Sequence, residues 1–426
     1  MKKISVVLLL SLILSSLFSC SYETAHSDPL QSIETQGSYG ELQDTATTLS
    51  GDDGVELNPK ESKVTFLAVG DNIIYNGQLR EGLANGKNKE GVEYDFSSMY
   101  KNVADIIASY DLAFVNQETP LAGKEFGYSQ YPNFNSPQEL GDNLIEVGFD
   151  IFNIATNHML DVGSDGLAGT IKYFKSKDVL MVGGYDDEED FYNVRYAEKN
   201  GIKIAVVGFT YGGNGKRPSS DTFIPYIYEK DKVHYKNDEP TVDSERMVKW
   251  IDLAEQTADV VIVSMHWGAE YNQKPNAEQK RLAQLLSDAG ADVILGHHTH
   301  CIQPIEWIEG KDGNKTLCFY SLGNFTSETD ETVSLVGGLA SFDIILNERD
   351  GLSIDNVSLR PTVMDYRSSF NKNTVYLLEE YSDELCKGHN IVSYFKKKLS
   401  MDILHGYVDG VIDVKYLPQS YLDSIS

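Results

Sequence analysis

Short apolar stretches alternate with segments of helical spacing along the chain from Val64 onward. The apolar stretches are rich in β-branched residues, which is typical of buried strands. The segments between them place apolar residues three and four positions apart, and several begin with Asp or Ser and end with Gly, as helices do. This alternation predicts an α/β protein with buried parallel or mixed sheets covered by helices. The predicted strands are VTFLAVG, DLAFVNQE, FDIFNIATNH, IKIAVVGF, DVVIVSMHWG, DVILGHHTH and LCFYSLGNF, and the predicted helices are SSMYKNVADIIASY, PQELGDNLIEVG, DGLAGTIKYFKSK, VDSERMVKWIDLAEQTA and AEQKRLAQLLSDAG.

The C-terminal part of the chain has a different pattern. After Gly337, two strand-like stretches, LASFDIIL and LSIDNVSLRPTVM, follow each other without a helix between them. We expect them to pair as antiparallel strands that finish a sheet. Residues from about 375 to 426 have the pattern of helices and loops, with no assigned role. We therefore divide the folded region into a main domain, residues 62–345, and terminal strands with a helical tail, residues 346–426.

The N-terminus has a pattern of its own. Lys2 and Lys3 precede an apolar run that ends just before Cys20. The run is shorter than the ~20 apolar residues of a membrane-spanning helix, so a secretory signal peptide over residues 1–19 fits it better than a signal-anchor helix. Cys20 is then the lipidated first residue of a bacterial lipoprotein. Residues 20–61 have almost no apolar periodicity and predict a flexible tether that keeps an extracytoplasmic domain attached to the membrane.

The charge balance narrows the choice of partners. The 426 residues include 36 Lys and Arg against 64 Asp and Glu, a formal net charge of -28. Removal of residues 1–19 takes two lysines away and gives -28 - 2 = -30. A surface this acidic excludes a protein that binds nucleic acid by neutralising its phosphates. Four Cys in a chain of this length exclude a disulfide scaffold.

Polar side chains directly follow most of the predicted strands. Open α/β sheets bind ligands at the carboxyl ends of their strands, so a reactive residue at such a place is well positioned for chemistry. Five of the nine His residues lie there, and scattered core histidines would not be sorted in this way. The polar residues at strand ends are Asp71, Asn116, Glu118, Asn157, His158, His266, His297, His298 and His300.

His and carboxylate donors together indicate a transition-metal centre. Imidazole is a borderline ligand, so this donor set suits manganese, zinc or iron better than calcium. Two such ions, bridged by a carboxylate ~3.5 to 4 Å apart, would lower the pKa of a shared water toward ~7 and hold both oxygens of an in-line displacement. The alternative is a hydrogen-bonded polar cluster without metal. It is the weaker interpretation, because so many polar groups are costly to bury at one sheet edge.

Six motifs, in order along the chain, resemble those of a known family. GDNII, NQETPL, ATNHMLDVGSDGL, HWGAEY, GHHTHCIQ and SLGNF are similar to motifs of the capsule-synthesis protein CapA family, the poly-γ-glutamate biosynthesis relatives of calcineurin-like metallophosphoesterases. The resemblance covers residues 62–345. It implies a four-layer α-β-β-α sandwich of two mixed sheets, which agrees with the α/β pattern, and one or two divalent metal ions.

The resemblance also implies roles for single residues. Asp71 matches the metal ligand of the first motif, and Glu118 matches the carboxylate that bridges two ions. His158 matches the histidine that acts on the leaving group. Related phosphoesterases supply a histidine two residues after the first aspartate, where this chain has Ile73, so one of the two ion sites has fewer ligands. The metal ligands implied in this way are Asp71, Glu118, Asn157, His266, His298 and His300.

Four neighbouring residues keep two interpretations each. Asp161 either orients the imidazole of His158 or caps the next helix. Asn116 either forms a hydrogen bond to a metal ligand or belongs to a turn. His297 either supports a ligand or faces the substrate. Asn324 either contacts substrate or forms a turn.

Two functions of different classes remain. The first is a membrane-tethered, metal-dependent hydrolase or transferase of phosphoester or amide bonds, which the resemblance connects with an extracellular anionic polymer. Bound cations reverse the local charge of an acidic surface and so allow a polyanion to bind. The second is a non-catalytic, metal-binding subunit of a polymer synthesis and export complex. A general phosphatase of the 5′-nucleotidase type is a weaker third.

Overall fold

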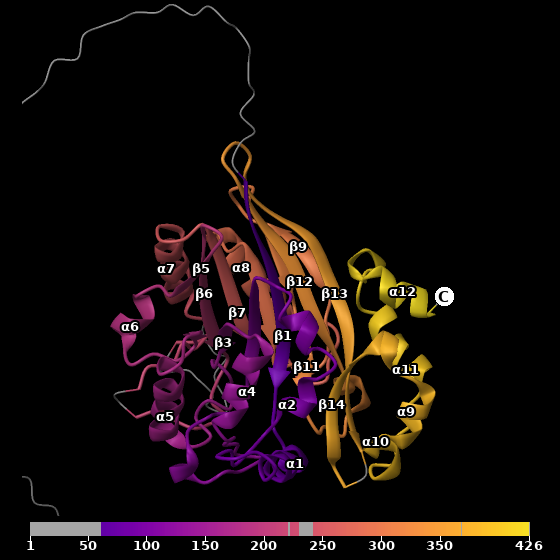
Figure 1. Cartoon of the computed structure of the whole chain (residues 1–426). Helices are drawn as coiled ribbons and strands as arrows, with labels where there is room; N and C mark the ends of the chain where they lie inside the picture. Colours follow the sequence, from indigo (N-terminus) through magenta and orange to yellow (C-terminus); the bar gives the residue numbers. More distant parts are fainter. Residues whose placement is uncertain (1–60, 220–221, 230–241, 368, 426) are drawn as a thin grey trace, which may run out of the picture. The chain divides into compact units, whose positions relative to one another are not determined.

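The chain folds around two mixed β-sheets, which Figure 1 shows in the computed structural model. The structure describes residues 61–219, 222–229, 242–367 and 369–425. The predicted signal peptide, the lipidated Cys20 and the tether up to residue 60 lie outside the described residues. None of the helices among the described residues has both the length and the apolar character needed to cross a membrane.

The larger sheet has eight strands: β1 (Glu61–Asn72), β2 (Leu112–Gln117), β3 (Ile151–Asn153), β4 (Leu180–Val182), β11 (Asn324–Thr326), β12 (Val336–Asn347), β13 (Gly351–Arg367) and β14 (Asn371–Leu377). Their order is β14-β13-β12-β1-β2-β3-β4, with β11 also paired to β1. The pairs from β1 to β4 are parallel. The pairs β1–β12, β12–β13 and β13–β14 are antiparallel, as expected for the strands after Gly337.

The smaller sheet has six strands: β5 (Tyr196–Lys199), β6 (Ile202–Thr210), β7 (Val260–His266), β8 (Val293–His297), β9 (Ile305–Glu309) and β10 (Lys315–Phe319). Their order is β5-β6-β7-β8-β10-β9, and the four strands from β6 to β10 in this order are parallel. Only the outer strands β5 and β9 run antiparallel to their neighbours. The parallel strands are buried, because helices cover one face and the larger sheet covers the other.

Two of the longer helices, α7 and α8, begin at capping residues that the sequence supplies. Asn276 accepts a hydrogen bond from the backbone of Gln279 at the start of α8, and Gly290 ends this helix in the left-handed region with φ of 109°. Asp243 caps α7 through the backbone of Arg246. The helices before the C-terminal tail are α1 (Asn76–Gly86), α2 (Ser97–Tyr100), α3 (Ala104–Ile107), α4 (Glu139–Val147), α5 (Gly163–Lys175), α6 (Glu188–Tyr192), α7 (Ser244–Glu255) and α8 (Ala277–Ala289).

Alternate residues of the strands bury two different faces. In β1, Phe66 and Ala68 pack in the core between the sheets, together with Val206 of β6. Leu67 and Val69 point the other way and pack with buried residues of α2 to α5. The outer face of the smaller sheet packs in the same manner against α7 and α8. The layers are helix, sheet, sheet and helix, which confirms the predicted α/β sandwich.

The C-terminal tail extends the core between the sheets. Its helices are α9 (Asp383–Gly388), α10 (Asn390–Ser393), α11 (Met401–Asp409) and α12 (Gln419–Ile425), which Figure 1 shows beside β13. Leu404 and Val408 of α11 and Tyr421 of α12 are buried in the same cluster as Leu359 and Val363 of β13. The tail therefore covers a face of β13 that would otherwise expose apolar side chains.

One predicted strand differs from the structure. LCFYSLGNF divides between two strands, because β10 ends at Phe319 in the smaller sheet and β11 begins at Asn324 in the larger. Gly323 between them has φ of 68°, and a Cβ on Gly70 would lie 1.8 Å from its carbonyl oxygen. Two glycines are thus needed where the chain crosses from one sheet to the other against β1.

One predicted helix is interrupted. The segment over residues 97–110 forms the short helices α2 and α3 instead of one helix. The backbone N–H of Val103 bonds to the carbonyl of Tyr100, three residues earlier, so the regular four-residue hydrogen-bond pattern stops there. Met99, Val103 and Ile107 are still buried together, which is the helical spacing that the sequence shows.

Candidate metal centre

Strands from both sheets end at one place in the molecule. Asp71, near the end of β1, is in register with Asn116 of β2 and with Asn324 of β11. In the other sheet, His266 at the end of β7 is in register with His297 at the end of β8. Parallel pairing brings the polar residues that follow each strand to the same edge. The two sheets meet at this edge, because Asp71 Oδ1 lies 3.8 Å from His297 Nδ1.

Asp71 is fully buried among polar partners. Its Oδ1 accepts a hydrogen bond from Asn116 Nδ2 at 2.7 Å, and its Oδ2 lies 3.0 Å from His300 Nδ1. The backbone N–H of His298 donates to the same carboxylate at 3.2 Å. Burial by itself raises the pKa of Asp71, but the hydrogen bond from His300 and its charge lower the pKa below the usual value. Asp71 is therefore a carboxylate held in its charged form.

Glu118 lies just after β2 and has no hydrogen-bond partner on either carboxylate oxygen, although it is only 1% exposed. Its Oε1 lies 3.8 Å from His158 Nε2, 4.0 Å from His266 Nε2 and 3.9 Å from His300 Nε2. These distances are too long for hydrogen bonds. Two donors that each bind one ion at about 2.1 Å lie about 3.4 Å apart in tetrahedral geometry. The spacing around Glu118 is therefore close to what an ion between carboxylate and imidazole requires.

His298 and His300 follow β8 in the left-handed region of backbone space, with φ of 86° and 57°. Such a conformation costs of order 1–3 kcal/mol for a residue other than glycine and is common at functional sites. The ring of His298 lies 4.8 Å from that of His266, and its Nδ1 is buried without a partner. The backbone of the loop after β8 is thus held in an unfavourable conformation that keeps two imidazoles beside the other donors.

Asn157 links the larger sheet to the smaller one. It lies in the loop after β3, and its Oδ1 is 2.9 Å from Nε2 of His266. Its amide nitrogen donates to the side chain of Asn214 at 3.2 Å. Asn157 and His266 are both almost fully buried, and Nδ1 of His266 has no partner. The pair therefore places one amide oxygen beside an imidazole whose Nε2 lies 4.0 Å from Glu118 Oε1.

The donor set as a whole fits a divalent transition metal. Among the described residues, two groups of three potential ligands have all their ligand atoms within 4.8 Å of one another. Buried carboxylate oxygens and imidazole nitrogens without partners cost free energy unless something binds them. A mixture of nitrogen and oxygen donors suits ions such as manganese, zinc or iron. The two groups are Asp71, Glu118 and His266, and Glu270, His298 and His300.

The electrostatics of the histidines also suit metal binding. Burial and the neighbouring His298 hold the pKa of His266 well below its usual value, and burial with the charge of His300 lowers the pKa of His298 to about 3. A neutral imidazole keeps a lone pair for a metal. In His300, burial lowers the pKa, but the charges of Glu118, Asp71 and Glu270 and the hydrogen bond with Asp71 together outweigh it and raise the pKa to about 9. His300 must therefore release a proton when an ion binds.

His158 lines a cavity of about 330 Å³ next to Glu118, which we call the metal cavity. Its Nδ1 lies 2.7 Å from Asp161 Oδ2, and its ring packs edge-on against Phe134 with 4.8 Å between centroids. The same oxygen of Asp161 accepts a hydrogen bond from the backbone N–H of Phe134 at 2.7 Å. The cap residue of α5 is Val162, without a side-chain hydrogen bond. The geometry therefore favours Asp161 as the residue that orients the imidazole, and not as a helix cap.

Three further predicted residues support the ligands and do not line the metal cavity. Asn116 donates to Asp71 and accepts a hydrogen bond from Asn153 at 2.7 Å. Asn324 Oδ1 lies 3.0 Å from Nδ1 of His300. His297 is fully buried against the ring of Phe114, and burial lowers its pKa to about 4. These placements favour a supporting role over substrate contact.

The sequence analysis missed a carboxylate that reaches the centre. Glu270 belongs to the HWGAEY motif, four residues after His266, and lines the metal cavity. Tyr271 has φ of 61° and donates its backbone N–H to the carbonyl of Thr299 at 2.8 Å, which ties this loop to the histidine loop. The signal in the sequence was an acidic residue four positions after a histidine that ends a predicted strand. Other unpredicted residues of the cavity wall are Tyr75, Tyr131, Phe134, Tyr271 and Glu328.

Comparison with protein families agrees with this arrangement. Residues 65–329, more than half of the chain, match the family model described as bacterial capsule synthesis protein PGA_cap. The chain belongs to the PGA_cap family. The matched residues include all the predicted ligands, from Asp71 to His300. The resemblance to the CapA family is thereby confirmed.

Curated relatives have corresponding names. This PGA_cap chain is 29% identical over 355 residues to "Capsule biosynthesis protein CapA" of Bacillus anthracis, a match that covers 82% of this chain and 80% of the relative. It is 32% identical over 255 residues to "PGA biosynthesis protein CapA" of Bacillus subtilis (strain 168), with 59% of this chain and 62% of the relative covered. Its similarity to these proteins thus extends through most or the larger part of each.

Solved structures are more distant. A putative 5′-nucleotidase from Staphylococcus aureus has a TM-score of 0.43 and 18% identity, with 73% of this chain and 56% of the other covered. The NAD nucleotidase of Haemophilus influenzae has a TM-score of 0.40 and 13% identity, with 86% and 59% covered. At these TM-scores, neither likeness carries an argument about the activity of the PGA_cap chain.

Proposed function

We propose that this PGA_cap protein is a membrane-tethered, extracytoplasmic protein of capsule or poly-γ-glutamate biosynthesis whose metal centre hydrolyses or transfers phosphoester or amide bonds. The observation that carries the catalytic part is the carboxylate of Glu118, which is buried without a hydrogen bond while three imidazoles lie 3.8 to 4.0 Å away. The name of the Bacillus subtilis relative, a PGA biosynthesis protein, supports the choice of polymer.

The proposed ion-binding residues form two groups that both lie next to Glu118. The ligand atoms of Asp71, Glu118 and His266 lie within 4.8 Å of one another, and so do those of Glu270, His298 and His300. Glu118 Oε1 lies 4.0 Å from His266 Nε2 in its own group and 3.9 Å from His300 Nε2 in the other. When bound, one or two ions of manganese, zinc or iron would supply a hydroxide nucleophile and neutralise charge on the reacting oxygens. The protein's own contribution is to hold the ligands in place without rearrangement.

In this proposal His158 handles the proton of the leaving group. Its Nδ1 is occupied by Asp161, so the Nε2 side of the ring faces Glu118 and the metal cavity. An imidazole at this position can donate a proton to the departing oxygen or nitrogen. Asp161 is a positioning residue, because it touches His158 and the backbone of Phe134.

The wall of the metal cavity makes substrate binding depend on bound cations. Glu118, Glu270, Glu328 and Asp330 all line it. Without ions, these carboxylates would repel a phosphate or a carboxylate of the substrate. Bound divalent ions reverse the local charge. We therefore expect an anionic substrate to bind the metal cavity only in the metal-loaded protein.

The membrane tether is the part of the proposal that depends on sequence alone. Lys2 and Lys3, the apolar run after them and Cys20 form the pattern of a lipoprotein signal. Replacement of the lipid acceptor, Cys20→Ala, should release the protein from membranes or block its processing. Unchanged partitioning of this variant into detergent would contradict a lipid anchor.

Elemental analysis of the full chain, followed by a metal-supplemented substrate screen, tests the catalytic part. The screen should include γ-glutamyl oligomers, phosphomonoesters, phosphodiesters and nucleotides. Bound metal with turnover of a γ-glutamyl or phosphoester substrate is the expected result. Bound metal without turnover of any of them would replace the proposal with a non-catalytic subunit of a synthesis and export complex. Hydrolysis of nucleotides alone would indicate a general phosphatase.

A further inference from the structure

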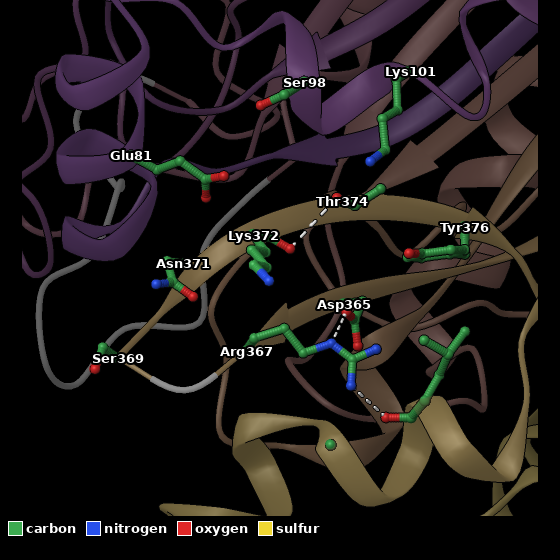
Figure 2. Close-up of a pocket in the computed structure, with 12 residues that line it drawn as sticks. Glu81, Ser98, Lys101, Asp365, Arg367, Ser369, Asn371, Lys372, Thr374 and Tyr376 are labelled. Carbon is green, nitrogen blue, oxygen red and sulfur yellow. Dashed lines mark hydrogen bonds and ion pairs between the residues drawn. The ribbon is translucent and has the colours of Figure 1, made fainter.

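A second and larger cavity, of about 940 Å³, lies beside the edge strand β14 (Figure 2). Residues of α1 and α2 line one side of it, and residues of β13, β14 and α9 line the other. We call it the lysine cavity, after Lys101 and Lys372. It contains none of the candidate metal ligands. Helix α1 contributes to both cavities, because Tyr75 directly before it lines the metal cavity and Glu81 within it lines the lysine cavity.

The floor of the lysine cavity is one face of a β-hairpin. Lys372, Thr374 and Tyr376 alternate along β14 and therefore point to the same face. Asp365 and Arg367 of β13 belong to the same cavity wall, and Asp365 is in register with Thr374. The two strands thus present charged groups and hydroxyl groups on a single surface.

Three of the charged groups in this wall already have partners within the protein. Arg367 Nε lies 2.6 Å from Asp365 Oδ2, and Arg367 Nη1 donates to the carbonyl of Leu385 at 2.9 Å, as Figure 2 shows. Glu81 Oε2 accepts two hydrogen bonds from Asn373, one from the backbone at 2.8 Å and one from the side chain at 2.7 Å. Arg367, Asp365 and Glu81 therefore have structural roles.

The two lysines are different. Within the described part of the chain, neither Lys101 nor Lys372 has a hydrogen-bond or ion-pair partner for its amino group, and both side chains are exposed. Lys101 follows α2 directly and reaches down toward β14 in Figure 2. Lys372 has φ of 56°, in a hairpin where Ser369 and Phe370 are also left-handed. In a chain of net charge -28, two unpaired cations from separate elements thus face one cavity.

The free edge of β14 is closed, which excludes recognition by strand addition. Glu81 occupies the backbone N–H of Asn373, and Asn102 donates its side-chain amide to the carbonyl of Val375 at 3.2 Å. A partner strand would have to displace both side chains. A ligand of this region therefore meets side chains in the cavity and not the backbone of the edge strand.

We propose that the lysine cavity binds the carboxylates of an anionic polymer at a site separate from the metal centre. Each lysine offers a point charge with three donors, and the hydroxyl of Tyr376 adds a neutral donor. The only guanidinium in the wall, Arg367, is already engaged, so the forked geometry that favours phosphate is missing. Two cations on separate elements suit successive carboxylates along a chain. The identification of that chain as poly-γ-glutamate rests on the proposed function.

Polymer binding by the full chain in the presence of EDTA tests the site without its metal. The probe is a fluorescently labelled γ-glutamate oligomer, titrated at low ionic strength. We expect the double variant Lys101→Gln, Lys372→Gln to bind about tenfold more weakly, since each exposed charge pair contributes up to ~1 kcal/mol. The matched control is Lys311→Gln, Lys315→Gln, which removes two exposed lysines of the β9–β10 hairpin. It should bind within about twofold of the unchanged protein.

Three results would overturn the proposal. Equal losses in the two double variants would mean that the oligomer responds only to total charge. Binding that needs metal and disappears in His298→Ala, His300→Ala would place the polymer at the metal centre, which leaves the proposed function intact. Displacement of the oligomer by an equal concentration of inorganic phosphate would make this a phosphate site. The variant Lys101→Arg, Lys372→Arg should restore binding if the charges carry it.

Discussion

The metal cavity and the lysine cavity adjoin the same helix, α1, but their polar groups differ in burial and in hydrogen-bond partners. At the metal centre, Glu118 and His298 are almost completely buried and have ligand atoms without partners. In the lysine cavity, the buried charge of Asp365 is paired with Arg367, and the unpaired Lys101 and Lys372 are exposed to water. The first arrangement costs free energy when empty, whereas the second costs little.

The difference indicates which kind of ligand each cavity can bind. A buried carboxylate without a hydrogen bond must bind a cation that stays in the protein, such as a metal ion, or take up a proton; burial and the charge of Asp71 raise the pKa of Glu118 well above its usual value. Exposed lysines remain hydrated between binding events, so their ligand can come and go. We therefore expect large and coupled effects from substitutions in the metal cavity and small, additive ones in the lysine cavity.

The strongest test of this contrast removes two ligands of the metal cavity together. We expect His298→Ala, His300→Ala to lose metal affinity by about 10⁴-fold or more, since each loss should exceed the ~10 to 100-fold of a residue that only supports a ligand. Metal content by elemental analysis and competition with a chelator measure it. His405→Ala, which changes a histidine of the tail helix α11, is the control and should keep its metal. Stoichiometric metal in the double variant would show that the histidines are not ligands.

The next effect separates chemistry from binding within the metal cavity. We expect His158→Ala to lower turnover by ~10² to 10⁴-fold while metal content and melting temperature stay nearly unchanged, because this imidazole faces the cavity and supports no strand. Asp161→Asn should cost less, ~10 to 100-fold, if the carboxylate only orients the ring. Turnover of His158→Ala at the unchanged rate would remove the catalytic role and favour a binding subunit.

Glu328 is a buried acid that belongs to neither group of candidate metal ligands. It tests whether burial alone accounts for the difference between the two cavities. Burial raises the pKa of Glu328 to about 7, although the backbone N–H of Gly77 donates to it. The folded state thus holds the proton more tightly than the unfolded state, in which the pKa of this group is near its ordinary value of 4.5. The stability from this group is present below pH ~4.5 and is lost as the pH rises to ~7, by up to ~3 kcal/mol.

The matched variant is Glu328→Gln, which keeps an acceptor for Gly77 and cannot ionise. Urea unfolding of the metal-free protein should show a gain in stability over the unchanged protein that is greater at pH 8 than at pH 5. Glu309→Gln, at an exposed position of β9, should show no such difference. A gain that is equal at both pH values would mean that Glu328 does not titrate in this range.

The smallest expected effect concerns Glu270, a carboxylate that is exposed to water but lies close to buried metal ligands. Glu270 is exposed like the lysines, yet its oxygen lies within 4.8 Å of the ligand atoms of His298 and His300. We expect Glu270→Gln to weaken one ion by about tenfold, in the lower range for a residue at the margin of a metal site, and to leave the other ion in place. Calorimetric titration of the metal-free protein resolves the two ions. No change in either would place Glu270 with the solvated surface.

Local sequence signals predicted the candidate ligands but only three of the residues that line the metal cavity, Glu118, His158 and His300. Asp71 and His266 were found because each ends an apolar stretch, and the strand order then brings such ends together. Glu270 was missed, because its approach depends on a left-handed turn at Tyr271 and a hydrogen bond to a loop that is distant in sequence. Residues with these conformations have no distinctive sequence pattern.

The fold shows the same limit. The continuous apolar run of β1 predicted a buried strand, and the structure shows it buried on both faces. The division of LCFYSLGNF between two sheets could not be predicted from its apolar pattern, because it depends on the contact of Gly323 with Gly70 about 250 positions away. The role of the tail was likewise unpredictable, since Leu404 is buried in a cluster that includes residues of β12 and β13, which lie far earlier in the chain.

The pairing of β1 with β12 has a consequence for how the chain acquires its shape. Glu61 lies opposite Asn347, so these partners are 347 - 61 = 286 positions apart. Contacts of such long range slow folding, because a large loop must close before they can form. During synthesis, β1 emerges first and keeps one edge unpaired until almost the whole chain has followed, which is an opening for aggregation. Asp71, near the end of β1, therefore reaches its place late in folding. Either rapid pairing of β12 with β1 or a chaperone would protect the open edge of β1 until then.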